Sequence, residues 1–490
     1  MPVRILSTCL ALGVLTLLCP ATATHAADIT APLTVQWIHS LGEEPTNTAT
    51  PAVRGERVYL THRGVLRCLD ARTGAEEWTF SVSPATIVTS PVPCEDLIIV
   101  GGSDARLYAL DTANGDEVWD LGCAGRIAPD PLIFNDLLIL GAAEMVYAVA
   151  PRTGQATWIC PLTSPAKAGP VTDGSMLYFL CQDSSIQCVD GTAGRYRWRQ
   201  GFSTGPRTFP PVIAGRRVVI ATGRSLHGIS RHSSLVWSQE MPAGIGGAPV
   251  LVDDVLYLPC VDGRIYTLYP RSGTLRREVT LKLDDAVTSP PLVTNTAVVA
   301  GTATGLLSLL DPDSGNLEWA YRCRTPEQHA DEAAEYGIYA PIVGYDGSVY
   351  CLTGSGDLYR FSAGAPDSAG PNFAAFQPEP GSVLAAGRTF DLTVAVTDAG
   401  SGVDPSSLQV TLDGAPVEVE FEPGSGLATV HPSSVAEGPH IVTIVAKDYR
   451  GNVGTDEWSF LTDSSIAPPE GELGGRTTLA GRTTQQRRGR

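Results

Sequence analysis

The residue types that most often perform catalysis or bind metals are few and scattered in this chain of 490 residues. It has 8 histidines and 11 cysteines, but no two cysteines are adjacent and no Cys-x-x-Cys-His haem attachment occurs. A Gly-x-Ser-x-Gly nucleophile turn, a His-Glu-x-x-His zinc motif and a phosphate-binding loop are also missing from the sequence. The sequence therefore gives no positive support for an enzyme, although distant segments can still combine into an active site.

Charged side chains are the other candidates for a binding site. Acidic pairs stand at Glu43 and Glu44 and at Asp284 and Asp285, a mixed group comprises His329, Asp331, Glu332 and Glu335, and basic residues stand at Arg126, Lys167 and Arg207. The spacing within the mixed group matches no known metal motif. The mixed group can be explained either as a solvated charged loop or as a binding site.

The overall charge excludes one large class of partner. The chain has 34 Lys and Arg against 52 Asp and Glu, a formal net charge of −18, so we expect no general affinity for nucleic-acid phosphates. Only 18% of the residues are charged, and 51 glycines and 37 prolines punctuate the chain. This composition favours many short strands separated by turns.

The first 27 residues have the pattern of a secretory signal peptide. Arg4 precedes an apolar run that ends at Leu18, and Ala26 and Ala27 offer a cleavage site. Lipidation is not expected, because Leu18 rather than a small residue precedes Cys19. No later segment supplies the roughly 20 apolar residues that a membrane helix needs. We therefore expect an exported monomer, periplasmic or extracellular, with no transmembrane segment in the mature chain.

The cysteines outside the signal lie mostly in apolar strand patterns, although exported proteins can form disulfides. This placement favours small buried side chains over a disulfide framework.

A period of about 40 residues runs through two thirds of the chain. One tryptophan marks most of the units, with Arg277 in the one empty slot: Trp37, Trp78, Trp119, Trp158, Trp198, Trp237 and Trp319. A glycine usually stands four residues earlier, as Gly74 does before Trp78, and it suits a tight hairpin turn. A proline also recurs once per unit. Each unit is predicted to form four antiparallel strands, with the tryptophan on the fourth.

Eight such units fit a closed β-propeller of eight blades. The last unit ends at Phe361 without a fourth strand, and the opening segment from Val35 to Ser40 is a fourth strand without the other three. We predict that these two fragments complete one blade and close the ring. The expected fold is all-β, with the propeller over residues 28–364.

Residues just before the recurrent prolines should crowd around the central axis of this ring. They are small and, apart from one aspartate, neutral: Thr50, Ser90, Asp130, Gly169, Pro210, Ala248, Pro290 and Ala340. One carboxylate in eight positions is a poor start for acid–base or metal chemistry.

The repeat unit from Ser90 to Trp119, with Gly101-Gly102-Ser103-Asp104 and Leu107-Tyr108-Ala109-Leu110-Asp111, resembles the pyrroloquinoline quinone (PQQ)-like propeller repeat. That resemblance implies either a periplasmic quinoprotein dehydrogenase or a non-enzymatic scaffold similar to the outer-membrane assembly lipoprotein. The dehydrogenases, as the resemblance implies, clamp the quinone between a tryptophan and a disulfide of adjacent cysteines, with calcium and a catalytic aspartate. This chain has no adjacent cysteines, and its propeller tryptophans all occupy one packing position. We predict no bound quinone.

One face of the propeller should be electrically polarised. The connections between successive blades all emerge on that face. The acidic and mixed groups precede blades one, seven and eight, which are neighbours in a closed ring, and Arg126, Lys167 and Arg207 precede blades three, four and five. The connection before blade eight is also the longest, and a short helix is predicted after Pro326. Long insertions on a repeat scaffold often form its binding surface.

A second, smaller domain follows a linker over residues 365–375. Residues 376–463 alternate strand patterns with turn sequences and resemble a bacterial immunoglobulin-like β-sandwich. Such modules can bind calcium, and Asp398, Asp448 and Asn452 are the candidate ligands, although side-chain-capped turns explain these residues too. Residues 464–490 have the composition of a disordered tail.

Two classes of function are compatible with these features. The favoured one is an exported non-enzymatic scaffold that presents a propeller face to a protein or cell-envelope partner, with the sandwich as a spacer. The alternative is a quinoprotein-type oxidoreductase that depends on PQQ or a metal.

Overall fold

The fold is described from a computed structural model of the chain. It covers residues 29–42, 49–128, 130–202, 207–276, 281–283, 285–323, 337–364, 368–387, 390–398, 402–422, 426–432, 435–448 and 451–466. Within these ranges all regular structure is β-strand and no helix occurs. None of these residues therefore belongs to a helix able to cross a membrane.

Eight antiparallel sheets follow one another along the first three quarters of the chain, and we number them sheet 1 to sheet 8. Sheet 1 holds β2 (Ala52–Arg54), β3 (Arg57–His62), β4 (Val65–Asp70) and β5 (Glu76–Phe80). Sheet 2 holds β6 (Val92–Cys94), β7 (Leu97–Gly101), β8 (Arg106–Asp111) and β9 (Glu117–Gly122). Sheet 3 holds β10 (Leu132–Phe134), β11 (Leu137–Ala142), β12 (Met145–Ala150) and β13 (Gln155–Pro161). Sheet 4 holds β14 (Val171–Thr172), β15 (Met176–Leu180), β16 (Ser185–Asp190) and β17 (Arg195–Gly201).

The later sheets repeat this pattern with small departures. Sheet 5 holds β18 (Val212–Ala214), β19 (Arg217–Thr222), β20 (Ser225–Ser230) and β21 (Leu235–Glu240). Sheet 6 holds β22 (Val250–Val252), β23 (Val255–Pro259) and β24 (Arg264–Tyr269), with β25 (Thr274–Leu275) and β26 (Leu281–Lys282) both paired to β24. Sheet 7 holds β27 (Leu292–Val293), β28 (Val298–Gly301), β29 (Leu306–Leu310) and β30 (Leu317–Arg322). Sheet 8 holds β31 (Val343–Tyr345), β32 (Ser348–Leu352), β33 (Asp357–Ala363) and β1 (Leu33–Ser40).

The fourth strand of sheet 8 comes from the other end of the repeat region. β1 pairs antiparallel with β33, with Val35 opposite Phe361 and Ser40 opposite Asp357. This is the pairing that the incomplete first and last units predict. Sheet 8 is therefore held together by two segments more than 300 residues apart in the sequence.

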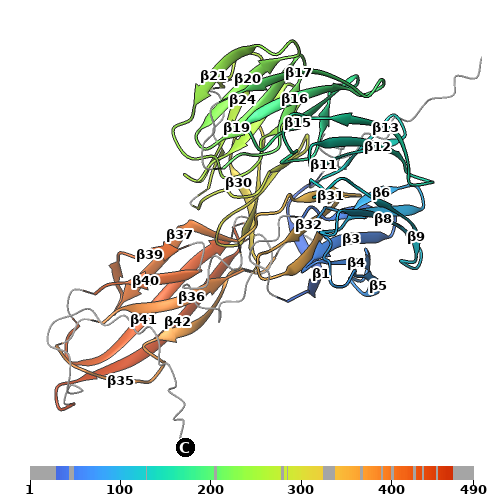
Figure 1. The fold of residues 1–490 in the computed structure, drawn as a ribbon. Coiled ribbons are helices and arrows are strands. Elements are labelled where there is room, and N and C mark those ends of the chain that lie inside the picture. The colour runs from blue at the N-terminus through green and yellow to red at the C-terminus, as the bar shows by residue number, and fades with distance from the viewer. Residues whose placement is uncertain are drawn as a thin grey trace, which may run out of the picture.

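Apolar clusters lie between successive sheets. The inner strands are buried on both faces, as in β7, whose five residues are all buried, whereas outer strands such as β9 alternate between exposed and half-buried side chains. One cluster joins sheet 7 to sheet 8 through Leu309 and Phe361. Another joins sheet 8 to sheet 1 through Leu358 and Leu60. Because each sheet packs on the next in this way, Figure 1 shows them side by side, coloured from blue to yellow.

The C-terminal part of the chain forms two further sheets that pack face to face. One holds β34 (Asn372–Gln377), β36 (Leu392–Thr397), β40 (Leu427–Val430) and β39 (Glu420–Glu422). The other holds β35 (Val383–Ala385), β42 (Val453–Asp463), β41 (Gly438–Asp448), β37 (Val403–Leu412) and β38 (Ala415–Val417). Val394 and Ala428 of the first sheet share one buried apolar cluster with Ile444 and Trp458 of the second. β34 begins at Asn372, inside the segment expected to be linker.

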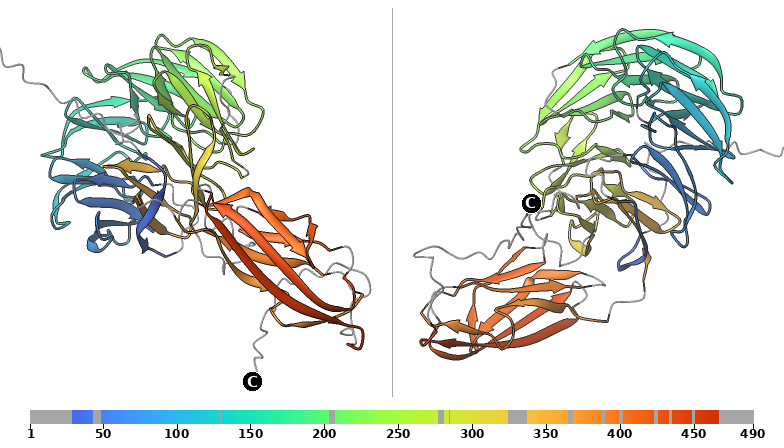
Figure 2. Two further views of the ribbon diagram at one scale, coloured as in Figure 1. Left: turned by 180° about the vertical axis from the view of Figure 1, so that it is seen from behind. Right: turned by 60° about the horizontal axis from the view of Figure 1, so that its bottom comes forward.

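The two-sheet unit projects away from the repeat sheets (Figure 2). It nevertheless approaches sheet 7 closely. A Cβ added to Gly402 would lie 2.5 Å from the carbonyl oxygen of Ala320 in β30, so the loop before β37 fits this strand only because residue 402 is glycine.

Candidate binding face

The inter-sheet connections and the turns between the second and third strands lie on the same end of each sheet. This follows from antiparallel pairing, in which alternate turns fall at opposite ends. Isolated bridges show it directly, since Ile87 of the connection after sheet 1 pairs with Gly102 at the end of β7, and Ile127 pairs with Ala142 at the end of β11. We call this end the connection face.

Arg126, Lys167 and Arg207 are exposed on the connection face, in three successive connections. Their backbones are fixed by hydrogen bonds to the next sheet. The Arg126 carbonyl accepts from Ala143 N at 2.9 Å, and Lys167 N donates to the Leu180 carbonyl at 2.7 Å. Within the described part of the chain, no hydrogen bond or ion pair engages the side chain of Arg126 or Lys167. The three residues, which we call the basic arc, thus present positive charge to solvent from rigid positions.

Asp285, the one acidic candidate on this face that the structure describes, is already satisfied locally. Its carboxylate accepts hydrogen bonds from Thr304 Oγ1 at 2.6 Å, Thr304 N at 3.0 Å and Ala286 N at 2.7 Å. It therefore caps a turn of sheet 7. The other acidic and mixed candidates, and the helix expected after Pro326, lie outside the described residues: Glu43, Glu44, Asp284, His329, Asp331, Glu332 and Glu335.

Arg207 and Asp285 approach the same tyrosine from different sheets. Burial raises the pKa of Tyr339, while the charge of Arg207 lowers this pKa and the charge of Asp285 raises it. These three residues belong to the connections before sheets 5, 7 and 8. Arg207 of the basic arc and Asp285 are therefore both close enough to Tyr339 to affect its hydroxyl.

Four further acidic residues on the connection face are not among those expected from the sequence. They stand in the turns between the second and third strands of sheets 2, 3, 4 and 6, and all are exposed: Asp104, Glu144, Asp183 and Asp262. The three aspartates are engaged within their own sheets. The Tyr108 hydroxyl donates to Asp104 at 2.5 Å, and the Tyr266 hydroxyl donates to Asp262 at 2.8 Å. The spacing of an aspartate four residues before a tyrosine could have identified two of them.

Asp183 uses a different partner. The guanidinium of Arg199, in the outer strand of the same sheet, donates two hydrogen bonds to its Oδ2 at 2.8 and 3.0 Å. The three turn aspartates therefore stabilise individual sheets.

The residues before the recurrent prolines include a short hydrogen-bonded chain. Thr50 N donates to Ser90 Oγ at 3.1 Å, and the Ser90 hydroxyl donates to Asp130 Oδ1 at 2.6 Å. Desolvation by the surrounding protein atoms raises the pKa of Asp130, and the hydrogen bond from Ser90 opposes that rise. The contact brings together equivalent positions of the connections before sheets 1, 2 and 3. It supplies one carboxylate with a hydroxyl partner and no second acid or base.

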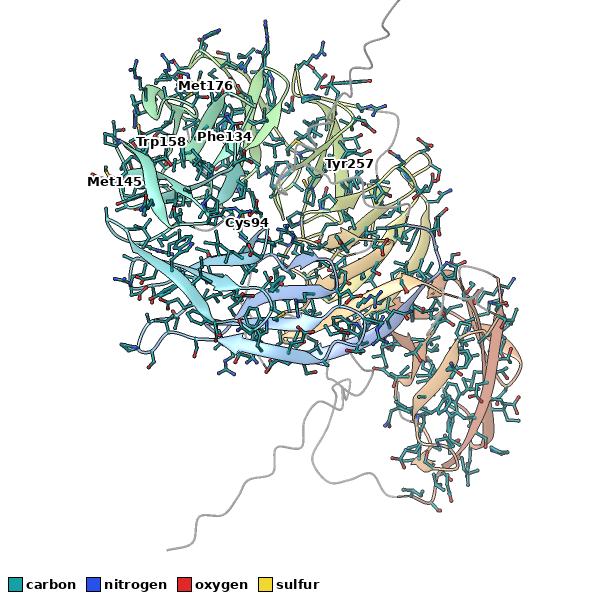
Figure 3. All side chains as sticks on the ribbon, turned by 90° about the vertical axis from the view of Figure 1, so that its right-hand side faces the viewer. Cys94, Phe134, Met145, Trp158, Met176 and Tyr257 are labelled. Carbon is teal, nitrogen blue, oxygen red and sulfur yellow. The ribbon has the colours of Figure 1, made fainter. Side chains whose placement is uncertain are left out.

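The repeat tryptophans are used in packing between sheets. The indole N–H of Trp37 donates to the Ala71 carbonyl at 3.0 Å, and that of Trp119 donates to the Pro151 carbonyl at 2.7 Å. In both cases the acceptor belongs to the next sheet. Figure 3 shows Trp158 and Phe134 in sheet 3, and a Cβ added to Gly194 of sheet 4 would lie 2.5 Å from the Trp158 ring. At these positions the tryptophan rings cover the backbone of the next sheet, which is a packing role.

The calcium candidates of the C-terminal unit act as turn caps. Buried Asp448 accepts hydrogen bonds from Asn452 N at 2.8 Å and Asn452 Nδ2 at 2.7 Å, and Asp398 accepts one from Gly402 N at 2.7 Å. Among the described residues, no group of three or more His, Cys, Asp and Glu side chains is placed to hold a metal ion.

Comparison with solved structures shows the β-propeller-like fold. BamB from Moraxella catarrhalis superposes with a TM-score of 0.52 at 15% identity, covering 68% of this chain and 98% of that chain. Quinohemoprotein alcohol dehydrogenase from Comamonas testosteroni gives a TM-score of 0.51 at 17% identity, covering 69% of this chain and 78% of that one. BamB and an alcohol dehydrogenase therefore share this fold, so the fold alone does not decide between the two functions considered.

Sequence comparison is more specific. The outer membrane protein assembly factor BamB of Moranella endobia is 24% identical over 298 residues, which are 54% of this chain and 76% of that protein. The protein of the same name from Yersinia pestis is 23% identical over 351 residues, covering 64% and 84% of the two chains. The family model described as "Outer membrane protein assembly factor BamB" matches residues 30–179 and 182–388. Since this match spans more than half of the sequence, the chain belongs to the BamB family of outer membrane protein assembly factors.

Proposed function

We propose that this protein is an exported, non-enzymatic scaffold whose connection face binds an acidic segment of a cell-envelope protein. The proposal rests on the basic arc. Arg126 and Lys167 are exposed cations without partners in the described part of a chain whose net charge is −18. Charges that are fixed in position and not neutralised internally favour a partner of opposite sign. The names of the family members, as assembly factors, support a protein partner.

In this proposal the eight sheets are the blades of one closed propeller, and β1 closes the ring. The cyclic series of apolar clusters supports it, because sheet 8 packs on both sheet 7 and sheet 1. The two-sheet unit would be an immunoglobulin-like spacer that holds the propeller away from a second attachment. Calcium binding at Asp398, Asp448 and Asn452 stays a prediction. So does the monomeric state.

A charge-reversal experiment tests the binding face. The variant R126E/K167E/R207E is compared with the control R72E/R195E/R216E, which changes three exposed arginines at the opposite ends of the sheets. Both variants alter the net charge equally, so they separate a local site from a general charge effect. We expect the first variant to lose at least tenfold in recovery of the partner from an envelope extract, and the control to retain it. Equal recovery by both variants would refute the proposal.

The oxidoreductase alternative has a separate test. The purified protein is equilibrated with PQQ and calcium and then desalted. If the protein is a scaffold, it should show no quinone absorption after desalting. Stoichiometric retention of PQQ would favour the quinoprotein alternative.

A further inference from the structure

Two buried cysteines lie at the packing surface between sheets 7 and 8. Cys323 follows the last residue of β30, and Cys351 is in β32. Both side chains are completely inaccessible to solvent and belong to the same apolar cluster. They are the only two cysteines in that cluster among the described residues.

Strand geometry directs the two thiols toward each other. Tyr321 and Cys323 are two residues apart and so project from the same side of their segment. On sheet 8, Cys351 lies directly opposite Tyr359 in the β32–β33 register. The rings of Tyr321 and Tyr359 are in contact, with centroids 6.2 Å apart. The cysteines are thus neighbours of two residues that touch across the same packing surface.

The electrostatics of the site agree with this geometry. Burial, and then the neighbouring Cys351 side chain, raise the pKa of the Cys323 thiol well above its usual value. The backbone at Cys323 is also fixed, since its N–H donates to the Gly305 carbonyl at 2.9 Å.

We propose that Cys323 and Cys351 form a disulfide that joins sheet 7 to sheet 8 in the exported protein. The inference rests on the export that is part of the proposed function, because an oxidising compartment is needed. The oxidant is a disulfide compound, such as oxidised glutathione or a protein disulfide. Its S–S bond is reduced to two thiols, while the two cysteine thiols lose two protons and two electrons and form one S–S bond.

The order of events follows from burial. Neither thiol is accessible once sheets 7 and 8 have packed, so a soluble oxidant reaches them only before this surface closes. The bond therefore forms during folding. It covalently ties the beginning of the connection before sheet 8 to the sheet that receives β1.

Differential alkylation of the full chain tests the proposal. The protein is expressed with its own N-terminal segment, recovered from the periplasmic fraction, denatured, and labelled with one alkylating reagent before reduction and a second reagent after it. Mass spectrometry then reads the label on each cysteine. We expect Cys323 and Cys351 to carry the second label. Cys68 and Cys188, which share their clusters with no other cysteine, should carry the first.

Two further samples make the outcome decisive. In Cys323→Ser, Cys351 should switch to the first label, and a second label there would overturn the pairing. If the protein is not exported, the chain is instead unfolded, reduced and refolded with oxidised glutathione, which tests the disulfide independently of location. First labels on both cysteines in this refolded sample would contradict the proposal.

Discussion

At the scale of single residues, Asp173 joins two sheets through a buried charge. Its side chain accepts hydrogen bonds from Arg231 Nε at 2.6 Å, the Tyr178 hydroxyl at 2.7 Å and Met176 N at 2.9 Å. Burial by itself raises the pKa of Asp173, but these bonds outweigh it and hold the pKa well below its usual value. Arg231 in turn offers its carbonyl to the Trp198 indole at 2.8 Å, so one acid organises the contact between sheets 4 and 5.

Asp173→Asn should lower the free energy of unfolding by about 2 kcal/mol at pH 7, since it removes a charge-assisted network while keeping the side chain's size. An acid whose pKa is depressed in the folded state stabilises the fold at pH values above its unfolded-state pKa of ~3.9. This contribution is lost as the pH falls through the folded-state pKa. The difference between wild type and variant, measured by urea denaturation, should therefore shrink below about pH 4. Asp183→Asn, at a more exposed ion pair, is the control and should cost less than about 1 kcal/mol. A difference independent of pH would contradict this role of the Asp173 charge.

At the scale of elements, one turn accounts for the close spacing of neighbouring sheets. The glycine between the third and fourth strands has a left-handed backbone, with φ of 76° at Gly115, and its bare Cα lies against the tryptophan of the preceding sheet. Sheet 5 has Ser233 at this position, with φ of 61°. A residue with a side chain at position 115 would have to adopt an unfavourable left-handed backbone conformation. Its Cβ would also collide with the ring of Trp78.

Gly115→Ala should destabilise the protein by roughly 2 kcal/mol, and Ser233→Gly should be neutral or stabilise it by up to about 1 kcal/mol, because only the second change relieves a left-handed non-glycine residue. Thermal unfolding of the two variants side by side checks the opposite signs. Equal destabilisation by both would show that the turn conformation is not the cause.

The N-terminal strand should matter as much as any strand inside a unit. Trp37 is 9% exposed and packs between sheets 8 and 1, whereas the next residue, Ile38, is 50% exposed. Trp37→Ala should lower the free energy of unfolding by about 3 kcal/mol or more, and Ile38→Ala should lower it by less than about 0.5 kcal/mol. Hydrogen exchange at the amides of β33 should accelerate in the first variant alone. Unchanged protection of β33 would mean that β1 contributes nothing to sheet 8.

The strands and the pairing of β1 with β33 could be predicted from sequence because they depend on period and turn chemistry, which recur in register from Trp37 to Trp319. Individual side-chain partners could not. Asp285 resembles a free surface acid in the sequence, but Thr304, 19 residues later, satisfies it. The early start of β34 also escaped prediction, since Asn372 to Gln377 follow a glycine- and proline-rich stretch typical of a linker. Contacts between distant residues decide such details, and a single sequence does not reveal them.

At the scale of the whole molecule, a local basic surface lies within a strongly acidic protein. The net charge of −18 disfavours acidic partners in general, so any acidic partner must approach the basic arc at short range. The attraction is screened at high salt, where the Debye length falls to about 3 Å at 1 M.

Partner binding should therefore weaken at least tenfold between low salt and about 1 M salt, mainly through slower association. The R126E/K167E/R207E variant should lose most of this dependence on salt. Association kinetics measured across an ionic-strength series check both expectations. Binding that strengthens with salt would instead indicate an apolar interface.

Site-specific photo-crosslinking in living cells tests the binding face most directly. A photoreactive amino acid replaces Lys167 in one strain and Arg195, which belongs to the same sheet 4 at its opposite end, in another. We predict a crosslinked envelope protein from position 167 and none from position 195. Crosslinks from position 195 alone, or from neither position, would contradict the claim that the connection face is the binding surface.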